Sequence, residues 1–189
     1  MSDFMRESRT NSSMIQKVLF ICTGNTCRSP MAEAMFRKMI LEETASATDT
    51  MEVVSAGIAT IDGTGASSHA IAVMEAAGID LRGHRSRQVT PELLNSADLV
   101  LTMTRDQKAI LIQMFPSAGK RIFTLAEFAG MSEPQAGAEE TGPFLGLDII
   151  DPFGLGMDAY RDCADQIKKY LSQVVRLLKT ASDNPESVD

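Results

Sequence analysis

The chain has 189 residues, of which 44% are hydrophobic, and its formal net charge at pH 7 is −7. This length and apolar content are enough for one ordinary globular domain with a full core. The acidic balance argues against nucleic acid as a partner, and no apolar run approaches the length that crosses a membrane. Three cysteines are an odd number, unlike the paired framework of a small secreted protein, so we expect a cytoplasmic location.

The strands are predicted from short apolar runs. Residues 1–16 are polar and lack the apolar centre of a signal peptide, so a flexible leader is expected there. Four β-branched apolar runs follow, at 17–22, 51–57, 98–103 and 120–125. Nearly unbroken apolar runs of this length suit parallel strands that are covered on both faces.

Helical patterns lie between these runs, and most of them open on a recognisable start signal. The last helix is predicted from about Asp158 to Lys179, with Cys163 on its apolar stripe. The earlier helices are expected after Pro30, after the capping serines Ser67 and Ser68, after Thr90–Pro91, and after the capping box of Thr104 and Gln107.

The alternation of strands and helices predicts the domain organisation. It favours an α/β fold, a single doubly wound domain over residues 17–180 with a four-stranded parallel sheet and helices on both faces. The stretch 131–147 is rich in Gly, Pro and Glu and is expected to be an inserted loop. Residues 181–189 are expected to form a disordered tail.

The stretch VLFICTGNTCRSP, residues 18–30, places a cysteine at the end of a buried strand, with five residues between Cys22 and Arg28. Gly24 and Asn25 tolerate left-handed backbone angles, so the amides of this loop can turn inward. A nest of amides at a helix N-terminus attracts an anion, and the guanidinium of Arg28 matches two phosphate oxygens. A small core residue is the alternative for an isolated cysteine, but it does not explain these neighbours.

The predicted function of this loop is to hold a phosphoryl group above a nucleophile. The cationic surroundings, with a hydrogen bond from Ser29, favour a thiolate at Cys22, which is the form that attacks phosphorus. The residues expected to bind the phosphate are Thr23, Gly24, Asn25, Thr26, Cys27, Arg28 and Ser29.

The loop resembles the active-site signature of the low-molecular-weight protein tyrosine phosphatase family, C-x5-R-S followed by P. The resemblance continues, in the order of the family, through MAEA at 31–34, SAG at 55–57, HRSRQ at 84–88, ADLVLTM at 97–103 and DPFG at 151–154. It implies a protein phosphatase that forms a phospho-cysteine on Cys22, acts on phosphorylated proteins as a monomer, and needs no metal or other cofactor.

The resemblance also implies which residue carries protons. It places the general acid at the Asp-Pro of DIIDPFG, and hence at Asp151, in a loop from which a carboxylate can reach the phosphate. His69 and His84 are alternative proton carriers, but a structural or surface role is the better interpretation of each. Asp148 and Asp158 are expected to be a loop carboxylate and a helix-cap carboxylate.

Two positions bear on the substrate. Tyrosine phosphatases of the family commonly carry an aliphatic residue where this chain has Thr26, and they flank the cleft with more aromatic rings than the single Phe153 of DPFG provides. The combination is similar to the protein arginine phosphatase branch, so phosphoarginine is the favoured substrate and phosphotyrosine the alternative. Asp151 suits a guanidinium leaving group because it can both pair with it and donate to its nitrogen.

Three further interpretations stay open. Arsenate reductases of this fold pass oxidation to extra cysteines, for which this chain offers only Cys163 beyond the loop. A reversible disulfide between Cys22 and Cys27 would switch the enzyme off under oxidation, although Cys27 is as readily explained as a small filling residue. A phosphate-binding module without activity would lack the nucleophile or the acid, and both are present here.

Overall fold

The computed structural model describes residues 15–43, 51–130 and 148–183. Four strands form one sheet in the order β2-β1-β3-β4, and every neighbouring pair is parallel. The strands are β1 (Lys17–Cys22), β2 (Glu52–Gly57), β3 (Leu99–Thr102) and β4 (Ile122–Thr124). The predicted four-stranded parallel sheet is therefore confirmed.

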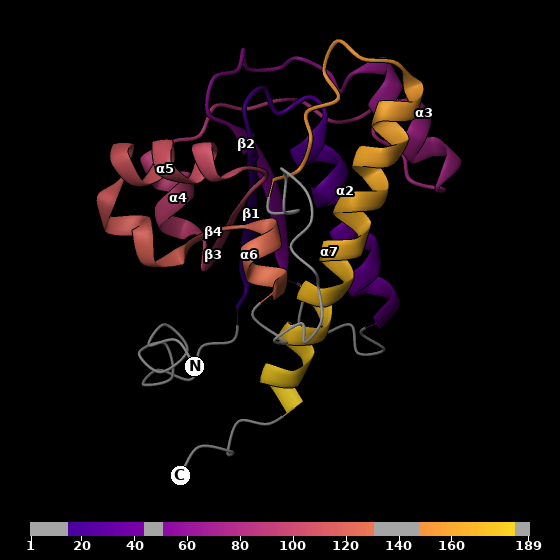
Figure 1. Ribbon diagram of the computed structural model, residues 1–189. Helices are drawn as coiled ribbons and strands as arrows, with labels where there is room; N and C mark the ends of the chain where they lie inside the picture. The colour runs from indigo at the N-terminus through magenta and orange to yellow at the C-terminus, as the bar shows by residue number, and fades with distance from the viewer. Residues whose placement is uncertain (1–14, 44–50, 131–147, 184–189) are drawn as a thin grey trace, which may run out of the picture.

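Helices cover both faces of the sheet (Figure 1). On one face, Val18, Phe20 and Cys22 of β1 pack in a core with α2, α3, α6 and α7. On the other face, Leu19 and Ile21 of the same strand pack with α4 and α5. The helices are α2 (Arg28–Glu43), α3 (Ser68–Ala76), α4 (Pro91–Ser96), α5 (Arg105–Met114), α6 (Leu125–Gly130) and α7 (Met157–Asp183), with the 3-10 helix η2 (Pro116–Arg121).

The predicted helix starts are also confirmed. The side chains of Ser67 and Thr90 accept hydrogen bonds from the backbone N–H of the third residue after each, which satisfies donors that a helix leaves open. Thr104 and Gln107 form the predicted capping box at the start of α5. The doubly wound arrangement follows from these elements, because each helix returns the chain to the same edge of the sheet.

Several boundaries differ from the sequence prediction by one residue, and two differences are informative. The run 120–125 contributes only three residues to β4, because Thr124 and Glu127 form reciprocal side-chain to backbone hydrogen bonds and start α6 immediately after the strand. Helix α7 runs past the predicted end at Lys179 and includes residues 181–183 of the predicted tail. The rest of that tail, the predicted inserted loop 131–147 and residues 1–14 of the predicted leader lie outside the described residues.

Within the described ranges, no helix has both the length and the apolar composition needed to span a membrane.

Candidate active site

The loop between β1 and α2 lies at the carboxyl edge of the sheet, where the strand order reverses. From central β1 the sheet continues to β2 on one side and to β3 on the other. In open α/β sheets, ligands bind in the crevice that opens at such a switch point. Residues 23–27 fill this position and lead directly into the first turn of α2.

The sulfur of Cys22 is surrounded by hydrogen-bond partners from its own loop. The backbone N–H of Asn25 donates to Sγ over 3.2 Å, and the hydroxyl oxygen of Ser29 lies 3.0 Å from Sγ. Asn25 has a φ of 51°, the left-handed conformation that turns the loop back over the cysteine. One amide of the predicted nest, that of Asn25, and the predicted neighbour Ser29 thus lie at the sulfur, and hydrogen bonds donated to sulfur favour a thiolate.

Asn25 is fully buried and fixes the shape of the loop. Its side-chain nitrogen donates to Ser29 Oγ over 2.9 Å and to Ser55 Oγ over 2.8 Å. Its side-chain oxygen accepts from the backbone N–H of Arg87 over 3.0 Å. Asn25 therefore joins the loop to α2, to β2 and to the segment before α4, so that the loop is held from three directions.

Three other side chains hold the loop from outside, and none of them was assigned this role from the sequence. Thr60 Oγ1 donates to the carbonyl oxygen of Gly24 over 2.7 Å, and Gln107 Nε2 donates to Thr23 Oγ1 over 3.1 Å. His84 Nε2 lies 2.7 Å from the carbonyl oxygen of Asn25. A carbonyl oxygen only accepts, so His84 Nε2 carries the hydrogen. The structural role expected for His84 is thus support of the loop.

Arg28 is buried at the base of this site and is paired with Asp151. One terminal nitrogen of the guanidinium donates to a carboxylate oxygen of Asp151, and the other donates to the carbonyl oxygen of Ile149 over 3.3 Å. Arg28 Nε is the buried side-chain donor that lacks a hydrogen-bond partner among the described residues. Such a donor calls for an acceptor, and an anion in the loop would supply one.

The loop that carries Asp151 is anchored to the sheet just before it. Ile149 is buried, and its N–H donates to the carbonyl oxygen of Met103 over 2.8 Å. Asp148 accepts from the backbone N–H of Arg105 over 2.8 Å, which is the loop role expected for it. Beyond these anchors the side chain of Asp151 is 47% exposed, and Phe153 is 74% exposed. The carboxylate therefore has room to turn, and Phe153 is available to contact a ligand.

The two remaining sequence candidates lie apart from the proton chemistry. The ring of His69 packs against Tyr160 with 5.1 Å between ring centroids. Asp158 forms an ion pair with Arg161 in the first turn of α7, as expected for a carboxylate near a helix start.

The thiol of Cys27 lies in a buried polar cluster. Its sulfur is 3.3 Å from Tyr160 Oη and 3.4 Å from Ser67 Oγ. Burial, followed by the hydrogen bond with Cys27, raises the pKa of Tyr160 above its ordinary value. Cys22, Cys27 and Cys163 are all free thiols.

Cys163 lies in the core between α7 and the sheet, on the predicted apolar stripe. Burial raises the pKa of its thiol to about 12. A thiol in this state is a poor nucleophile, so it does not suit the role of a resolving cysteine in arsenate reduction.

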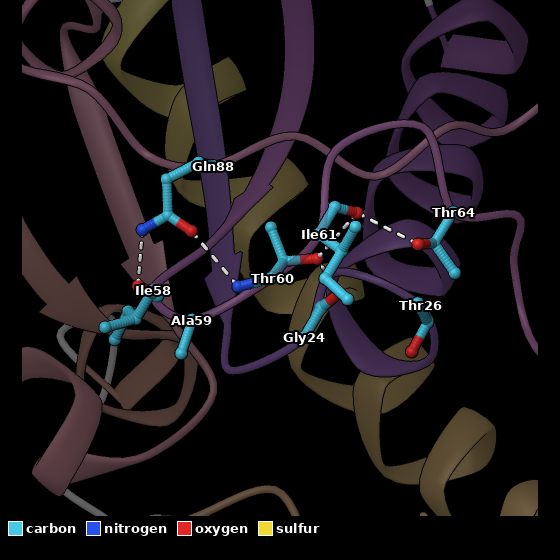
Figure 2. A pocket seen from close by; sticks show the side chains of 8 residues that line it. All are labelled: Gly24, Thr26, Ile58, Ala59, Thr60, Ile61, Thr64 and Gln88. Atoms are coloured by element: carbon cyan, nitrogen blue, oxygen red, sulfur yellow. Dashed lines mark hydrogen bonds between the residues drawn. The ribbon is translucent and has the colours of Figure 1, made fainter.

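A pocket of about 530 Å³ adjoins the outer side of the loop (Figure 2). Gly24, Thr26 and Ile61 are among the residues that line it, and Ile61 is 81% exposed. Gln88 also lines the pocket; its side-chain oxygen accepts from Thr60 N over 3.0 Å, and its side-chain nitrogen donates to the carbonyl oxygen of Ile58. Thr26 is half-buried and lines this pocket.

Within the described ranges, no three potential metal ligands of the His, Cys, Asp or Glu type lie together. That the reaction needs no metal or other cofactor remains a prediction from the sequence.

Cys22 at the end of β1, with a backbone amide and a hydroxyl at its sulfur, and a buried Arg28 paired with Asp151 from a separate loop are the parts that a cysteine-dependent phosphatase needs. The sequence model for low molecular weight phosphotyrosine protein phosphatases matches residues 17–184. The chain therefore belongs to this family, as its motifs predicted.

Relatives named for two different activities have similar sequence identity to the chain. The protein-arginine-phosphatase of Bacillus subtilis is 36% identical over 162 residues, covering 86% of this chain and 96% of that protein. A probable low molecular weight protein-tyrosine-phosphatase, EpsP of Ralstonia solanacearum, is 35% identical over 82% of this chain and 91% of its own. A solved structure of YwlE arginine phosphatase, a mutant with a phosphorylated active-site serine, superposes with a TM-score of 0.72 at 34% identity, covering 89% of this chain and 97% of that one.

Proposed function

We propose that this protein removes phosphate from phosphoarginine residues of proteins through a phospho-cysteine on Cys22. The carrying observation is the geometry at the end of β1, where the Cys22 sulfur lies within hydrogen-bond distance of Asn25 N and Ser29 Oγ. Beside it, the buried Arg28 leaves its Nε without a partner. This arrangement supplies both a nucleophile and a cradle for a phosphoryl dianion.

In the first step, the thiolate of Cys22 attacks phosphorus, a P–S bond forms, and the P–N bond to the guanidine of the substrate breaks. Asp151 in its protonated form donates its proton to the leaving nitrogen. Arg28 and the amides of residues 23–29 hold the three phosphoryl oxygens and stabilise the charge that they carry in the transition state.

In the second step, water attacks the phosphorus of the phospho-cysteine. The carboxylate of Asp151 takes one proton from that water, the P–S bond breaks, and Cys22 leaves as a thiolate. Inorganic phosphate is released, and Asp151 is again protonated for the next substrate.

The pairing between Arg28 and Asp151 gives this cycle a way to begin. A phosphoryl dianion competes with the carboxylate for the guanidinium, because it offers two oxygens in the bidentate geometry that arginine prefers. Asp151, half-exposed on its loop, is then displaced toward the leaving group. Released from Arg28 and half-exposed to water, the carboxylate takes up a proton from solvent, so the protonated acid of the first step is formed when a phosphoryl group occupies the loop.

The choice of phosphoarginine rests on Thr26 and Phe153 and on the relatives. Thr26 presents a small polar side chain on the phosphate loop, beside the adjoining pocket, where an aliphatic residue would offer only bulk. The aromatic component of the acid loop is the single exposed ring of Phe153. Relatives named for arginine phosphatase activity are as similar to the chain as those named for tyrosine phosphatase activity, so the substrate needs a direct test.

That test is phosphate release from matched phosphoarginine and phosphotyrosine peptides by wild type, Cys22→Ser and Thr26→Ile. We expect wild type to prefer phosphoarginine, Thr26→Ile to lose this preference, and Cys22→Ser to lose all activity. A wild-type preference for phosphotyrosine would assign the protein to the tyrosine branch and leave Thr26 as a packing residue. Undiminished activity of Cys22→Ser on both peptides would overturn the catalytic scheme.

We also propose that the enzyme works as a cytoplasmic monomer and that oxidation regulates it. Peroxide oxidises the Cys22 thiolate to a sulfenic acid, the Cys27 thiol attacks that sulfur, water leaves, and a disulfide forms that a thiol reductant reverses. Three free thiols support a reducing location. A Cys22–Cys27 disulfide in the peptide mass map after mild peroxide, with activity restored by reductant, is the expected result, and its absence in inactivated enzyme would refute this regulation.

A further inference from the structure

The side-chain amide of Gln166, on the third turn of α7, binds the main chain that leads to Asp151. Gln166 Nε2 donates to the carbonyl oxygen of Asp148 over 3.1 Å, and Gln166 Oε1 accepts from the backbone N–H of Ile150 over 3.3 Å. A carbonyl oxygen only accepts and a backbone N–H only donates, so these partners fix the orientation of the amide. Gln166 thus holds the main chain on both sides of Ile149.

The same segment is held from the sheet through Ile149. Directly after β3, the carbonyl oxygen of Met103 accepts from the N–H of Ile149 over 2.8 Å. The carbonyl oxygen of Ile149 accepts from Arg28 over 3.3 Å. Gln166 uses the backbone groups of the two flanking residues instead, so the two sets of hydrogen bonds do not compete. The segment 148–150 is therefore attached both to the sheet and to α7.

Beyond Ile150, the loop that carries Asp151 is held mainly at its ends. Its internal hydrogen bonds are local: Phe153 N donates to Asp151 Oδ1 over 3.1 Å, and Leu155 N donates to the carbonyl oxygen of Pro152 over 3.0 Å. The main chain then enters α7 (Figure 1). Both ends of this loop are thus attached to the same helix, one through the side-chain amide at Ile150 and the other through the main chain.

The side chain of Gln166 is itself supported on α7. Gln166 is half-buried, and Tyr170 lies one turn further along the helix. Burial raises the pKa of Tyr170, and a hydrogen bond with the Gln166 side chain opposes part of this rise. An amide that is already held by a neighbour loses less side-chain freedom when it binds the loop, so its two hydrogen bonds hold the main chain more firmly.

The proposed cycle makes this attachment important. In the free enzyme, the pair with Arg28 holds the carboxylate of Asp151 at the phosphate loop. When a phosphoryl group takes the place of the carboxylate, that pair is lost, and the position of Asp151 then depends on the two ends of its loop. Holding Ile150 keeps this loop short, which limits the distance that the carboxylate can move away from the leaving group.

We propose that Gln166 is a positioning residue for the general acid. By holding the main chain at Asp148 and Ile150, it keeps Asp151 within reach of the leaving group after Arg28 has turned to the phosphoryl oxygens. This inference rests on the proposed role of Asp151 as the acid. Gln166 itself contacts neither the phosphate loop nor Asp151 through these two hydrogen bonds, so it acts only through the main chain that it holds.

The test compares two substrates whose leaving groups differ in their need for a proton. Phenyl phosphate releases a strongly basic phenolate and depends on the acid, whereas the nitro group of p-nitrophenyl phosphate stabilises the leaving phenolate without a proton. For both, kcat/KM reports the steps up to loss of the leaving group. Gln166→Met keeps a long side chain that favours a helix but removes both hydrogen bonds. We expect kcat/KM to fall roughly 10-fold for phenyl phosphate and less than about 2-fold for p-nitrophenyl phosphate, because a positioned acid contributes roughly 10²- to 10⁴-fold.

Gln173→Met is the matched control, because it changes a half-buried glutamine two turns further along the same helix. It should match wild type on both substrates. A double-mutant cycle with Asp151→Asn tests whether Gln166 acts through the acid. If it does, Gln166→Met adds no further selective loss on phenyl phosphate in the Asp151→Asn background. Equal losses on both substrates in Gln166→Met, or no loss on either, would overturn the proposal.

Asp151→Asn alone separates this inference from the proposed function. A selective loss on phenyl phosphate in Asp151→Asn, without one in Gln166→Met, would leave Asp151 as the acid and overturn only the role of Gln166. No selective loss in Asp151→Asn would remove the acid from the catalytic scheme, and the role of Gln166 with it. Neither substrate contains arginine or tyrosine, so the result is independent of the peptide assay that decides between them.

Discussion

The close approach of β2 to the phosphate loop makes Gly57→Ala an informative perturbation. A Cβ at this position would lie 2.7 Å from the carbonyl oxygen of Thr23 and 3.0 Å from Cβ of Thr60. Gly57 cannot retreat easily, because its N–H donates to the Arg87 carbonyl oxygen over 2.9 Å and its own carbonyl accepts from Val89 N over 2.8 Å. The added methyl group therefore pushes against the backbone of the loop that surrounds Cys22.

The size of the effect follows from these contacts. Ordinary van der Waals contact begins at 3.4 Å, so the Thr23 carbonyl must move by 3.4 − 2.7 = 0.7 Å or the strand must shift by the same distance. Overpacking of this kind costs about 1–3 kcal/mol of unfolding free energy. For a domain of this size that corresponds to a fall in Tm of roughly 2–12 °C. Displacing catalytic groups by a large fraction of an ångström is expected to lower kcat/KM by roughly 10- to 100-fold.

Thermal unfolding and steady-state hydrolysis of p-nitrophenyl phosphate measure the two effects. Gly83→Ala is the matched control, because a Cβ at that position meets no heavy atom within 4 Å. We expect Gly83→Ala to match wild type in both assays. A Gly57→Ala protein that melts within 1 °C of wild type with unchanged kcat/KM would refute the argument that this glycine is required by the loop.

Three other predictions test separate features. Thr90→Ala removes the side-chain cap of α4 and should lower the free energy of unfolding, measured by urea denaturation, by about 1 kcal/mol. Its kcat/KM should stay unchanged, and a loss of activity would contradict this purely structural role. Burial raises the pKa of Cys163 to about 12, above its unfolded value, so the contribution of this thiol to the free energy of unfolding should be complete below about pH 8.5 and be lost as pH rises toward 12. In native protein at pH 8, iodoacetamide should alkylate Cys22 but not Cys163. Labelling of Cys163 at the rate of an unfolded thiol would contradict that. Tyr160→Phe removes one hydrogen bond from the Cys27 thiol, so the disulfide with Cys22 should form roughly 2- to 10-fold faster under peroxide, as measured by mass spectrometry. An unchanged rate would show that Tyr160 does not restrain this thiol.

The elements of the fold were largely determined by local sequence. Apolar runs predicted all four strands, and caps such as Thr90 and Thr104 predicted where helices begin. These signals act within a few residues, so they can be read without the tertiary structure. The T-x-x-E pattern of Thr124 and Glu127 was available in the same way and would have predicted α6, and overlooking it extended the last strand too far.

The phosphate loop was also legible in the sequence, because its chemistry is concentrated between Cys22 and Ser29. What the sequence left open was the set of contacts that orient it. Asp151 meets Arg28 across 123 positions, and His84 reaches the Asn25 carbonyl across 59. Neither contact has a local signal.

Contacts between distant residues were decided by the tertiary structure, and strand register gives a clear example. The parallel register pairs Cys22 with Gly57 and Phe20 with Ser55, and this brings the hydroxyl of Ser55 within reach of Asn25. The sequence by itself predicted which residues would carry the chemistry, since spacing and residue type are local properties. The tertiary structure determined which buried partners direct it, because hydrogen bonds between distant residues depend on strand register and on how the helices pack.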